Sequence, residues 1–404
     1  MLGTDQARGR RRAIIWASLL LSLAMLPPVA TEPNAFGEAQ TSVDRILPSI
    51  AENATCAEWA GWIPQRSEPA VVMQVVSTGY IPIQQNFIRL MERNSAFNRH
   101  NLYLMCLDDA SKRFFEQQMG IMCVPVSWLH PSTHRDIWKL RVHVMSCLVR
   151  VGRVDVIMSD ADALWIKDPT PELFHSESKN SESDGDGSGQ GGDQNGRIIS
   201  TVDTFGGGVG GAARRQQSSK KKSRADIRDS DVVASRGSFP GLLGQKWGTT
   251  ICMGFVLFRA RNVAGMATFL RVMEDFVMET GDDQASVNKA AADLGITWKK
   301  SSDMRYTEST RYGVGEIPAD SIAAAAGGHG ANFSGGVGSA FEDGHQEGHP
   351  FTVTLLPHST YTRVCDDTPV SDRTVVAHCL AAKVASVKTS WMETLKLWSV
   401  ENDP

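Results

Sequence analysis

The sequence contains few cysteines and no marked excess of either charge. Its 404 residues include seven cysteines, and no two of them form a CxxC pair, so we expect no zinc ribbon. The 41 basic residues against 45 acidic ones give no reason to expect a polyanion, and we predict no nucleic-acid partner. The chain is long enough to bury a sizeable core. These absences indicate an ordinary globular protein.

A short apolar run near the N-terminus is framed by arginines and prolines. Residues 13–26 read AIIWASLLLSLAML, which is short of the about 20 residues that usually span a bilayer. Basic residues before such a run are typical of a secretory signal peptide, although an uncleaved signal anchor also suits the thin early secretory membranes. We expect residues 1–30 to be one of these and residues 31–68 to be a stem or linker. A buried N-terminal helix is the alternative.

Either secretory interpretation places the rest of the chain in a lumen, which we expect to be that of the Golgi, or outside the cell. Asn53 and Asn332 each begin an Asn-x-Ser/Thr triplet and are then candidate glycosylation sites. Cys365 and Cys379 could pair in an oxidising lumen, and the odd total leaves at least one cysteine unpaired or cross-linked. Four other cysteines lie in apolar segments and are expected in the core: Cys106, Cys123, Cys147 and Cys252.

From about residue 69, short apolar strands alternate with helical patterns. Strands are expected at 70–76, 102–107, 121–124, 154–158, 249–259, 353–357 and 375–383, and helices at 83–93, 111–118, 134–151, 263–279 and from 282. This alternation predicts crossover connections and a mostly parallel sheet in an α/β protein. Ligands of such sheets bind beyond the carboxyl ends of the strands. We therefore predict a single domain over 69–401.

Two polar, glycine-rich tracts interrupt the pattern, at about 176–245 and 323–348. They cannot bury enough apolar area to offset the entropy of ordering, so we expect disordered insertions over surface loops. An isolated strand at 198–202 is the one exception expected within them. Lys220–Lys222 is interpreted as part of a solvated tract rather than a nucleic-acid site.

Two carboxylates, Asp160 and Asp162, follow the strand at 154–158. Hard divalent cations such as Mn²⁺ or Mg²⁺ take oxygen ligands of this kind together with phosphate oxygens. His378 follows another apolar strand and could complete a manganese shell, and Lys383 could offset diphosphate charge. The alternative is that the aspartates accept turn hydrogen bonds and that the histidine is structural.

Four segments in order resemble the nucleotide-diphospho-sugar transferase family, which includes plant and algal xylosyl-, arabinosyl- and galactosyltransferases. They are SDADALWIKDP (159–169), GFVLFRA (254–260), DDQASVN (282–288) and VVAHCLAAK…LKLW (375–398). The resemblance implies a GT-A fold, a Rossmann-like α/β/α sandwich that binds a nucleotide-sugar through a metal. Cys252 and Met253 depart from the family, in which Asn and a small residue often precede the glycine.

The resemblance also implies the roles of individual residues. The metal ligands would be Asp160, Asp162 and His378. Substrate-binding residues would be Thr78, Asp160, Gln284 and Lys383, and Asp283 would be the catalytic carboxylate.

The implied activity moves a sugar, expected to come from a UDP-sugar, to a hydroxyl of a glycan or glycoprotein with retention of configuration. Three alternatives stay open. One is a catalytically silent lumenal binding protein with the same fold. Another is a phosphatase of the haloacid dehalogenase type, although Leu164 stands where that class has Thr or Val. The last is a surface protein whose glycine- and serine-rich tracts are the functional part.

Overall fold

The computed structural model describes residues 56–64, 69–126, 133–174, 227–299, 310–328, 349–363, 370–378 and 384–400, all within the compact unit Ala54–Pro404. Several predictions lie outside these residues: the segment 1–30, both glycosylation triplets, the strand at 198–202, Lys383 and the pair Cys365 and Cys379. None of the helices in the described ranges combines the length and the hydropathy that crossing a bilayer requires.

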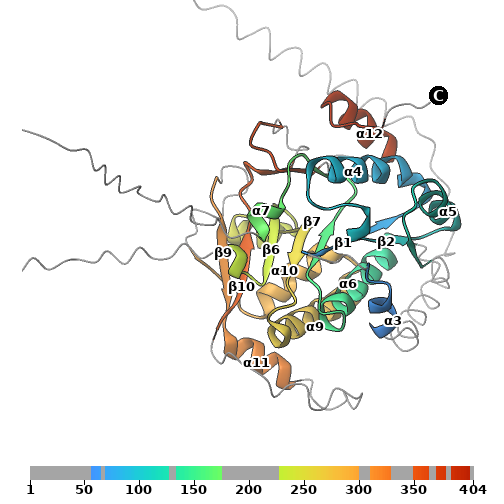
Figure 1. The fold of residues 1–404 in the computed structure, drawn as a ribbon. Helices are drawn as coiled ribbons and strands as arrows, with labels where there is room; N and C mark the ends of the chain where they lie inside the picture. The colour runs from blue at the N-terminus through green and yellow to red at the C-terminus, as the bar shows by residue number, and fades with distance from the viewer. Residues whose placement is uncertain are drawn as a thin grey trace, which may run out of the picture. The chain divides into compact units, whose positions relative to one another are not determined.

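A nine-stranded sheet forms the centre of the described residues (Figure 1). Its order is β3-β2-β1-β4-β7-β6-β10-β9-β8, and only β7 and β9 run against the other strands. The strands are β1 Val71–Val76, β2 Leu102–Cys106, β3 Cys123–Pro125, β4 Val156–Ser159, β6 Val232–Gly237, β7 Thr250–Phe258, β8 Thr297–Lys299, β9 Gly313–Ile317 and β10 Phe351–Leu355. The prediction of a mostly parallel sheet is confirmed. A smaller sheet has the order β11-β12-β5, formed by β11 Tyr361–Arg363, β12 Val376–His378 and β5 Ala163–Trp165.

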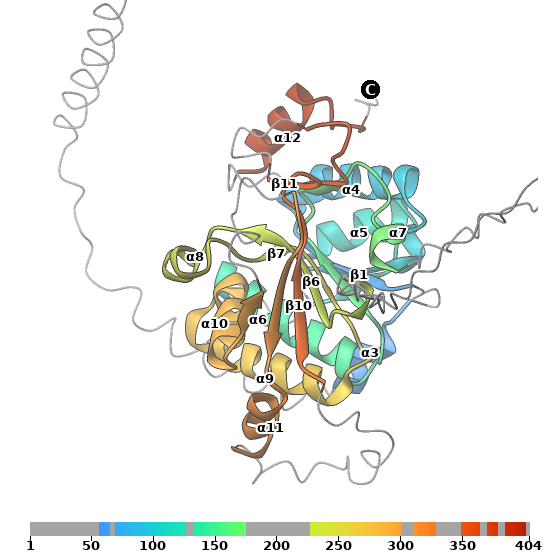
Figure 2. The same ribbon diagram turned by 90° about the vertical axis from the view of Figure 1, so that its left-hand side faces the viewer.

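Helices cover both faces of the large sheet, as the predicted α/β/α sandwich requires. Figure 2 shows α6, α9 and α10 on one face and α4 and α5 on the other. The helices are α3 Cys56–Gly61, α4 Ile81–Asn94, α5 Asp109–Gln118, α6 His134–Arg150, α7 Thr170–Leu173, α8 Gly241–Trp247, α9 Val263–Thr280, α10 Asp283–Asp293, α11 Ala319–Gly328 and α12 Ala385–Thr394. Short 3₁₀ turns are η1 Thr78–Tyr80, η2 Arg99–Asn101 and η4 Ile227–Asp229.

Side chains that start the helices and fill the core explain why these segments adopt this arrangement. Thr133 and Asp136 form a reciprocal capping box at the start of α6, which satisfies two backbone donors that a helix end otherwise leaves free. Trp165 is fully buried at the end of β5. Its indole makes edge contacts with the rings of Phe87 and Phe97, at centroid distances of 5.7 and 5.3 Å. The segment that carries the two aspartates is thereby fixed to the core.

The ordered region is larger than the sequence predicted. Helix α3 lies inside the expected linker 31–68, and the disulfide Cys56–Cys147 joins it to α6. Strand β6 lies inside the expected insertion 176–245, and helix α8 begins inside it. Helix α11 covers the start of the expected insertion 323–348. Strand β6 is short and polar at its end, and pairing with β7 and β10 stabilises it, whereas α11 is rich in alanine, the best helix former.

The cysteines are buried as predicted, but three of those assigned to the core are oxidised. Cys106 and Cys123 form a second disulfide, which joins β2 to β3. Among the described residues Cys252 is the free cysteine, and it is buried. An apolar sequence context predicts that a cysteine is buried, whereas its disulfide pairing depends on which elements become neighbours in the fold.

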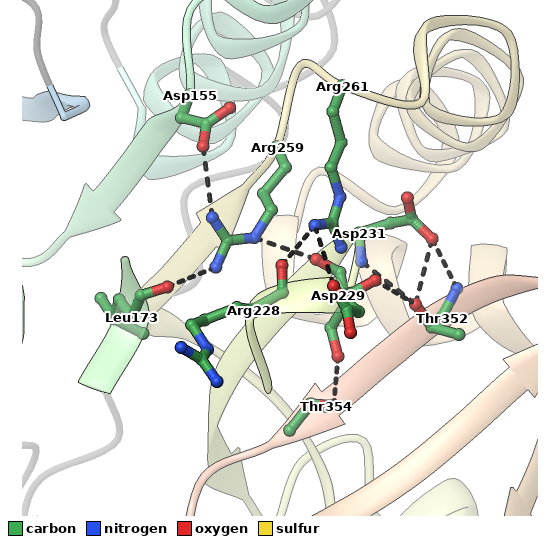
Figure 3. Close-up of polar contacts among 10 residues, drawn as sticks. Asp155, Leu173, Arg228, Asp229, Asp231, Arg259, Arg261, Thr352 and Thr354 are labelled. Carbon is green, nitrogen blue, oxygen red and sulfur yellow. Dashed lines mark hydrogen bonds and ion pairs between the residues drawn. The ribbon is translucent and has the colours of Figure 1, made fainter. Parts of the chain in front are cut away.

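One buried arginine holds both ends of the long insertion (Figure 3). Arg259, at the end of β7, donates from Nε to the carbonyl of Ser230 at 3.0 Å and from Nη2 to the carbonyl of Leu173 at 2.6 Å. Its Nη1 lies 3.4 Å from the Asp155 carboxylate. Leu173 precedes residues 175–226 and Ser230 follows them. The described segments on either side of residues 175–226 therefore bond to the same guanidinium.

Candidate active site

The two aspartates lie in a turn between β4 and β5. The Asp160 amide donates to the Gly254 carbonyl of β7 at 2.9 Å, and the Ala163 amide closes the turn by donating to the Asp160 carbonyl at 2.9 Å. Strand β12 pairs antiparallel with β5, so that His378 lies opposite Ala163. His378 Nε2 is 3.5 Å from Asp160 Oδ2 and 3.6 Å from Asp162 Oδ1. The structure thus brings together the three predicted metal ligands.

These three side chains fit a divalent cation. Their ligand atoms all lie within 4.8 Å of one another. His378 is 2% exposed, and its Nε2 atom has no hydrogen-bond partner. A buried polar atom that lacks a partner is unfavourable, and a cation between the two carboxylates and the imidazole would remove that cost. Two oxygens and one imidazole nitrogen form a donor set that suits Mn²⁺.

Without a cation, a proton takes its place on the histidine. Burial alone would lower the pKa of His378, but its contacts with Asp160 and Asp162 raise that pKa well above its ordinary value. Burial would likewise raise the pKa of Asp160, yet Arg141 and His378 hold it below its ordinary range. The imidazolium therefore balances the carboxylates until a cation displaces its proton.

Two further cations contact the aspartates, and the sequence did not predict either one. Arg141, on α6, places Nη2 2.9 Å from Asp160 Oδ1. Lys388, on α12, forms an ion pair with Asp162 through Nζ, and its ammonium lies 5.7 Å from the centre of the Tyr80 ring. The sequence predicted the helix of Arg141 but not helix α12, and it gave no sign that Arg141 or Lys388 lies at the site. Only the packing of α6 and α12 shows that they face the site.

Asp283 is the buried carboxylate predicted beside the site. It begins α10 and is 6% exposed, and its Oδ2 lies 3.4 Å from Nη1 of Arg141. Burial raises the pKa of Asp283 to about 6, and the positive charge of Arg141 opposes that rise. Its neighbour Asp282 caps the helix by accepting from the Ala285 amide at 2.6 Å. The capping role is therefore taken by Asp282, which leaves the Asp283 carboxylate facing Arg141.

Gln284 and Thr78 lie at the same edge of the sheet, and each forms hydrogen bonds to another segment of the protein. Gln284 donates from Nε2 to the Phe239 carbonyl at 2.7 Å, in the connection between β6 and α8. Thr78 donates from its amide to Asp108 Oδ2 at 2.8 Å and from its hydroxyl to Asp108 Oδ1. Neither residue contacts the two aspartates directly.

A pocket opens between η1 and α12. Its volume is about 370 Å³, which lies within the range of small-molecule sites. Its lining comes from η1, the first turn of α4 and helix α12, and consists of Gly79, Pro82, Ile83, Ala385, Ser386, Thr389, Ser390 and Glu393. Tyr80 of η1 and Lys388 of α12 belong to the two elements between which the pocket opens, and the Lys388 ammonium lies 5.7 Å from the centre of the Tyr80 ring.

Gly254 makes room for the histidine. An ideal Cβ added at this glycine would lie 1.8 Å from Cε1 of His378 and 2.4 Å from Nδ1. The absence of a side chain on β7 thus allows the imidazole ring to lie against the strand. The sequence contained this glycine in the GFVLFRA segment but gave no sign of the contact.

Comparison with known proteins agrees with this geometry. A search of the curated proteins found no match. A sequence model of the nucleotide-diphospho-sugar transferase family matches residues 101–395, well over half of the chain, and the matched span contains both aspartates, His378, Arg141 and Lys388. The order of the strands and the carboxylates at the end of β4 are those of a nucleotide-sugar enzyme with a GT-A fold, and the chain belongs to the nucleotide-diphospho-sugar transferase family.

Proposed function

We propose that the protein transfers a sugar from a UDP-sugar to a hydroxyl of a glycan or glycoprotein, with a divalent cation held by Asp160, Asp162 and His378. The observation that carries the proposal is the convergence of these side chains around Nε2 of His378, which makes no hydrogen bond and lies 3.5 and 3.6 Å from oxygens of the two carboxylates. The mixed oxygen and imidazole donors favour Mn²⁺ over Mg²⁺ as the resident cation. When bound, the cation supplies Lewis-acid stabilisation of the negative charge on the departing diphosphate.

The chain's own residues bind and orient the donor in this proposal. The pocket between η1 and α12 takes the nucleoside, and the hydroxyls of Ser386, Thr389 and Ser390 supply hydrogen bonds to it. Lys388 Nζ, which forms an ion pair with Asp162, adds a fixed positive charge beside the diphosphate. Lys383, which lies outside the described residues, stays the residue that the sequence predicts for the same role.

The acceptor binds on the Asp283 side of Arg141 in the same proposal. Asp283 is the carboxylate closest to the acceptor hydroxyl, and a pKa of about 6 lets it exchange a proton near neutral pH. Gln284 and the segment around Phe239 border this side. Retention of configuration is part of the proposal and follows from the resemblance to the family.

We further propose that the protein works in the lumen of the secretory pathway, at the Golgi membrane through residues 1–30, with secretion as the alternative. The disulfides Cys56–Cys147 and Cys106–Cys123 support a lumenal location, because such bonds form and persist in oxidising compartments. A protease-protection experiment tests this location: a vesicle fraction of the cell is treated with protease, with and without detergent, and the protein is detected by immunoblot. Protection only in intact vesicles is the expected result, and digestion without detergent would contradict it.

A panel of UDP- and GDP-sugars tests the activity. We expect the full chain to release nucleoside diphosphate from one donor in Mn²⁺ and from none in EDTA. Asp162→Asn should abolish this release, because it removes a charged ligand, whereas Asp293→Asn, at an exposed position on the end of α10, should leave it unchanged. Coupled detection of the released diphosphate measures each rate.

The other outcomes of the panel separate the alternatives. Binding of a nucleotide-sugar by calorimetry without any release would indicate a silent binding protein. The absence of both binding and release would eliminate the metal-site interpretation.

Removing the long insertion tests whether the glycine-rich tract carries the function. Because Arg259 bonds to both Leu173 and Ser230, a short Gly-Ser linker in place of residues 176–225 should close the chain without moving β6 or β7. We expect a melting temperature within a few degrees of the full chain and unchanged release of nucleoside diphosphate. A folded deletion variant without activity would instead favour a function located in the tract.

A further inference from the structure

The buried thiol of Cys252 touches the metal-facing histidine on its other ring nitrogen. Cys252 Sγ lies 3.8 Å from His378 Nδ1. Both side chains are almost completely buried, at 1% and 2% exposure. Cys252 sits on β7 two residues before Gly254, which allows the imidazole ring to approach the strand. The ring therefore has the two aspartates at one nitrogen and a sulfur at the other.

This arrangement determines where the imidazole must carry its proton. A neutral imidazole that offers the Nε2 lone pair to a cation has its proton on Nδ1. That buried N–H needs an acceptor, since an unpaired buried donor is costly. The contact that the described residues provide for Nδ1 is the sulfur of Cys252, which is a weak acceptor.

We propose that Cys252 is a positioning residue for the cation: its sulfur accepts the Nδ1–H hydrogen bond that fixes the His378 ring with Nε2 toward Asp160 and Asp162. The proposal rests on the proposed function, because it assumes that His378 is a metal ligand. Partners of this kind on the far nitrogen of a ligating histidine set its tautomer, and their removal typically lowers metal affinity about 10- to 100-fold.

Packing alone is the competing explanation, because a free buried cysteine also behaves as a small apolar residue. Alanine and serine separate the two explanations, since they are close in size and both are smaller than cysteine. Serine retains an oxygen acceptor for Nδ1–H, whereas alanine does not. A role in packing predicts the same effect for both variants, and a role in positioning predicts different effects.

The test measures binding of Mn²⁺ alone to the full chain, without any donor, from the electron paramagnetic resonance signal of the free ion at pH 7.5. We expect Cys252→Ala to weaken binding about 10- to 100-fold and Cys252→Ser to stay within about threefold of the unsubstituted protein. Melting temperatures in EDTA show whether each variant is folded. Equal affinities for the alanine and serine variants would overturn the proposal.

A second measurement does not depend on variants. ¹⁵N NMR of the histidines in the unsubstituted protein with Mg²⁺ should show His378 protonated at Nδ1 only, and a proton on Nε2 would overturn the proposal. The failure of the proposed function has a different signature. If the unsubstituted protein binds no Mn²⁺ or Mg²⁺, the metal site itself is refuted, whereas binding that is insensitive to Cys252→Ala refutes only the positioning role.

Discussion

Gly254→Ala is expected to abolish metal binding and sugar transfer while leaving a folded protein. The new Cβ would lie 1.8 Å from Cε1 of His378 and 2.6 Å from Nε2, and real Cβ atoms do not approach other atoms that closely. The backbone at this position cannot move away, because the Gly254 carbonyl accepts the Asp160 amide at 2.9 Å. The imidazole must therefore leave its place between the two aspartates. In the proposed function His378 holds a cation that would supply several kcal/mol of transition-state stabilisation, so losing this ligand predicts a fall in kcat/KM on the order of 10³-fold.

Steady-state kinetics with the best donor measure the loss of activity, and a separate binding experiment measures the loss of Mn²⁺ affinity. Gly241→Ala is the matched control, because a Cβ at Gly241 meets no atom within 4 Å. It should retain the activity and the melting temperature of the unsubstituted protein. Mn²⁺ affinity unchanged in Gly254→Ala would show that His378 does not hold the cation.

Arg141→Met is expected to cause a large loss of stability. The guanidinium lies between Asp160 and Asp283, at 2.9 and 3.4 Å, and its side chain is 11% exposed. Removing one partner of a buried ion pair leaves uncompensated charge and typically costs about 3–5 kcal/mol. We expect a loss of that size in the free energy of unfolding, measured by urea denaturation in EDTA at pH 7.5. Arg141→Lys should retain part of the stability, because a single ammonium cannot bond both carboxylates in the fork geometry of arginine.

The double variant Arg141→Met with Asp283→Asn is the internal control. Removing the Asp283 charge should recover part of the lost stability, because one of the two uncompensated carboxylates is then neutral. If Arg141→Met lowers the free energy of unfolding by the same amount with and without Asp283→Asn, the 3.4 Å contact contributes nothing to stability.

The pH dependence of the same carboxyl provides an independent check. Asp283 has a folded pKa of about 6, above its ordinary value of 3.8, so the folded state favours the protonated form. Its contribution to stability is full below about pH 4 and is lost as the pH rises through about 6. In EDTA, the melting temperature of Asp283→Asn should therefore rise relative to that of the unsubstituted protein between pH 5 and pH 8. A constant difference across this range would contradict the raised pKa.

The sequence by itself determined many of the strands and helices and the carboxylates of the candidate site. The apolar run that ends at Ser159 indicated a buried strand, and Asp160 and Asp162 after it indicated a metal. The resemblance of the DDQASVN segment to the family implied a site carboxylate at Asp283, and the structure assigns the cap of α10 to Asp282 and places Asp283 against Arg141. Periodicity, capping residues and short motifs are local properties, and a linear sequence records them directly.

Only the tertiary structure decided which distant residues meet. The contacts of Arg141 with Asp160 and of Lys388 with Asp162 arise from the packing of α6 and α12. The pairing of β12 with β5 places His378 beside the aspartates, and Gly254 matters because β7 passes behind that ring. Strand β6, hidden in a polar tract, forms because β7 and β10 flank it. These contacts join residues far apart in the chain, and their free energy appears only when the sheet has assembled.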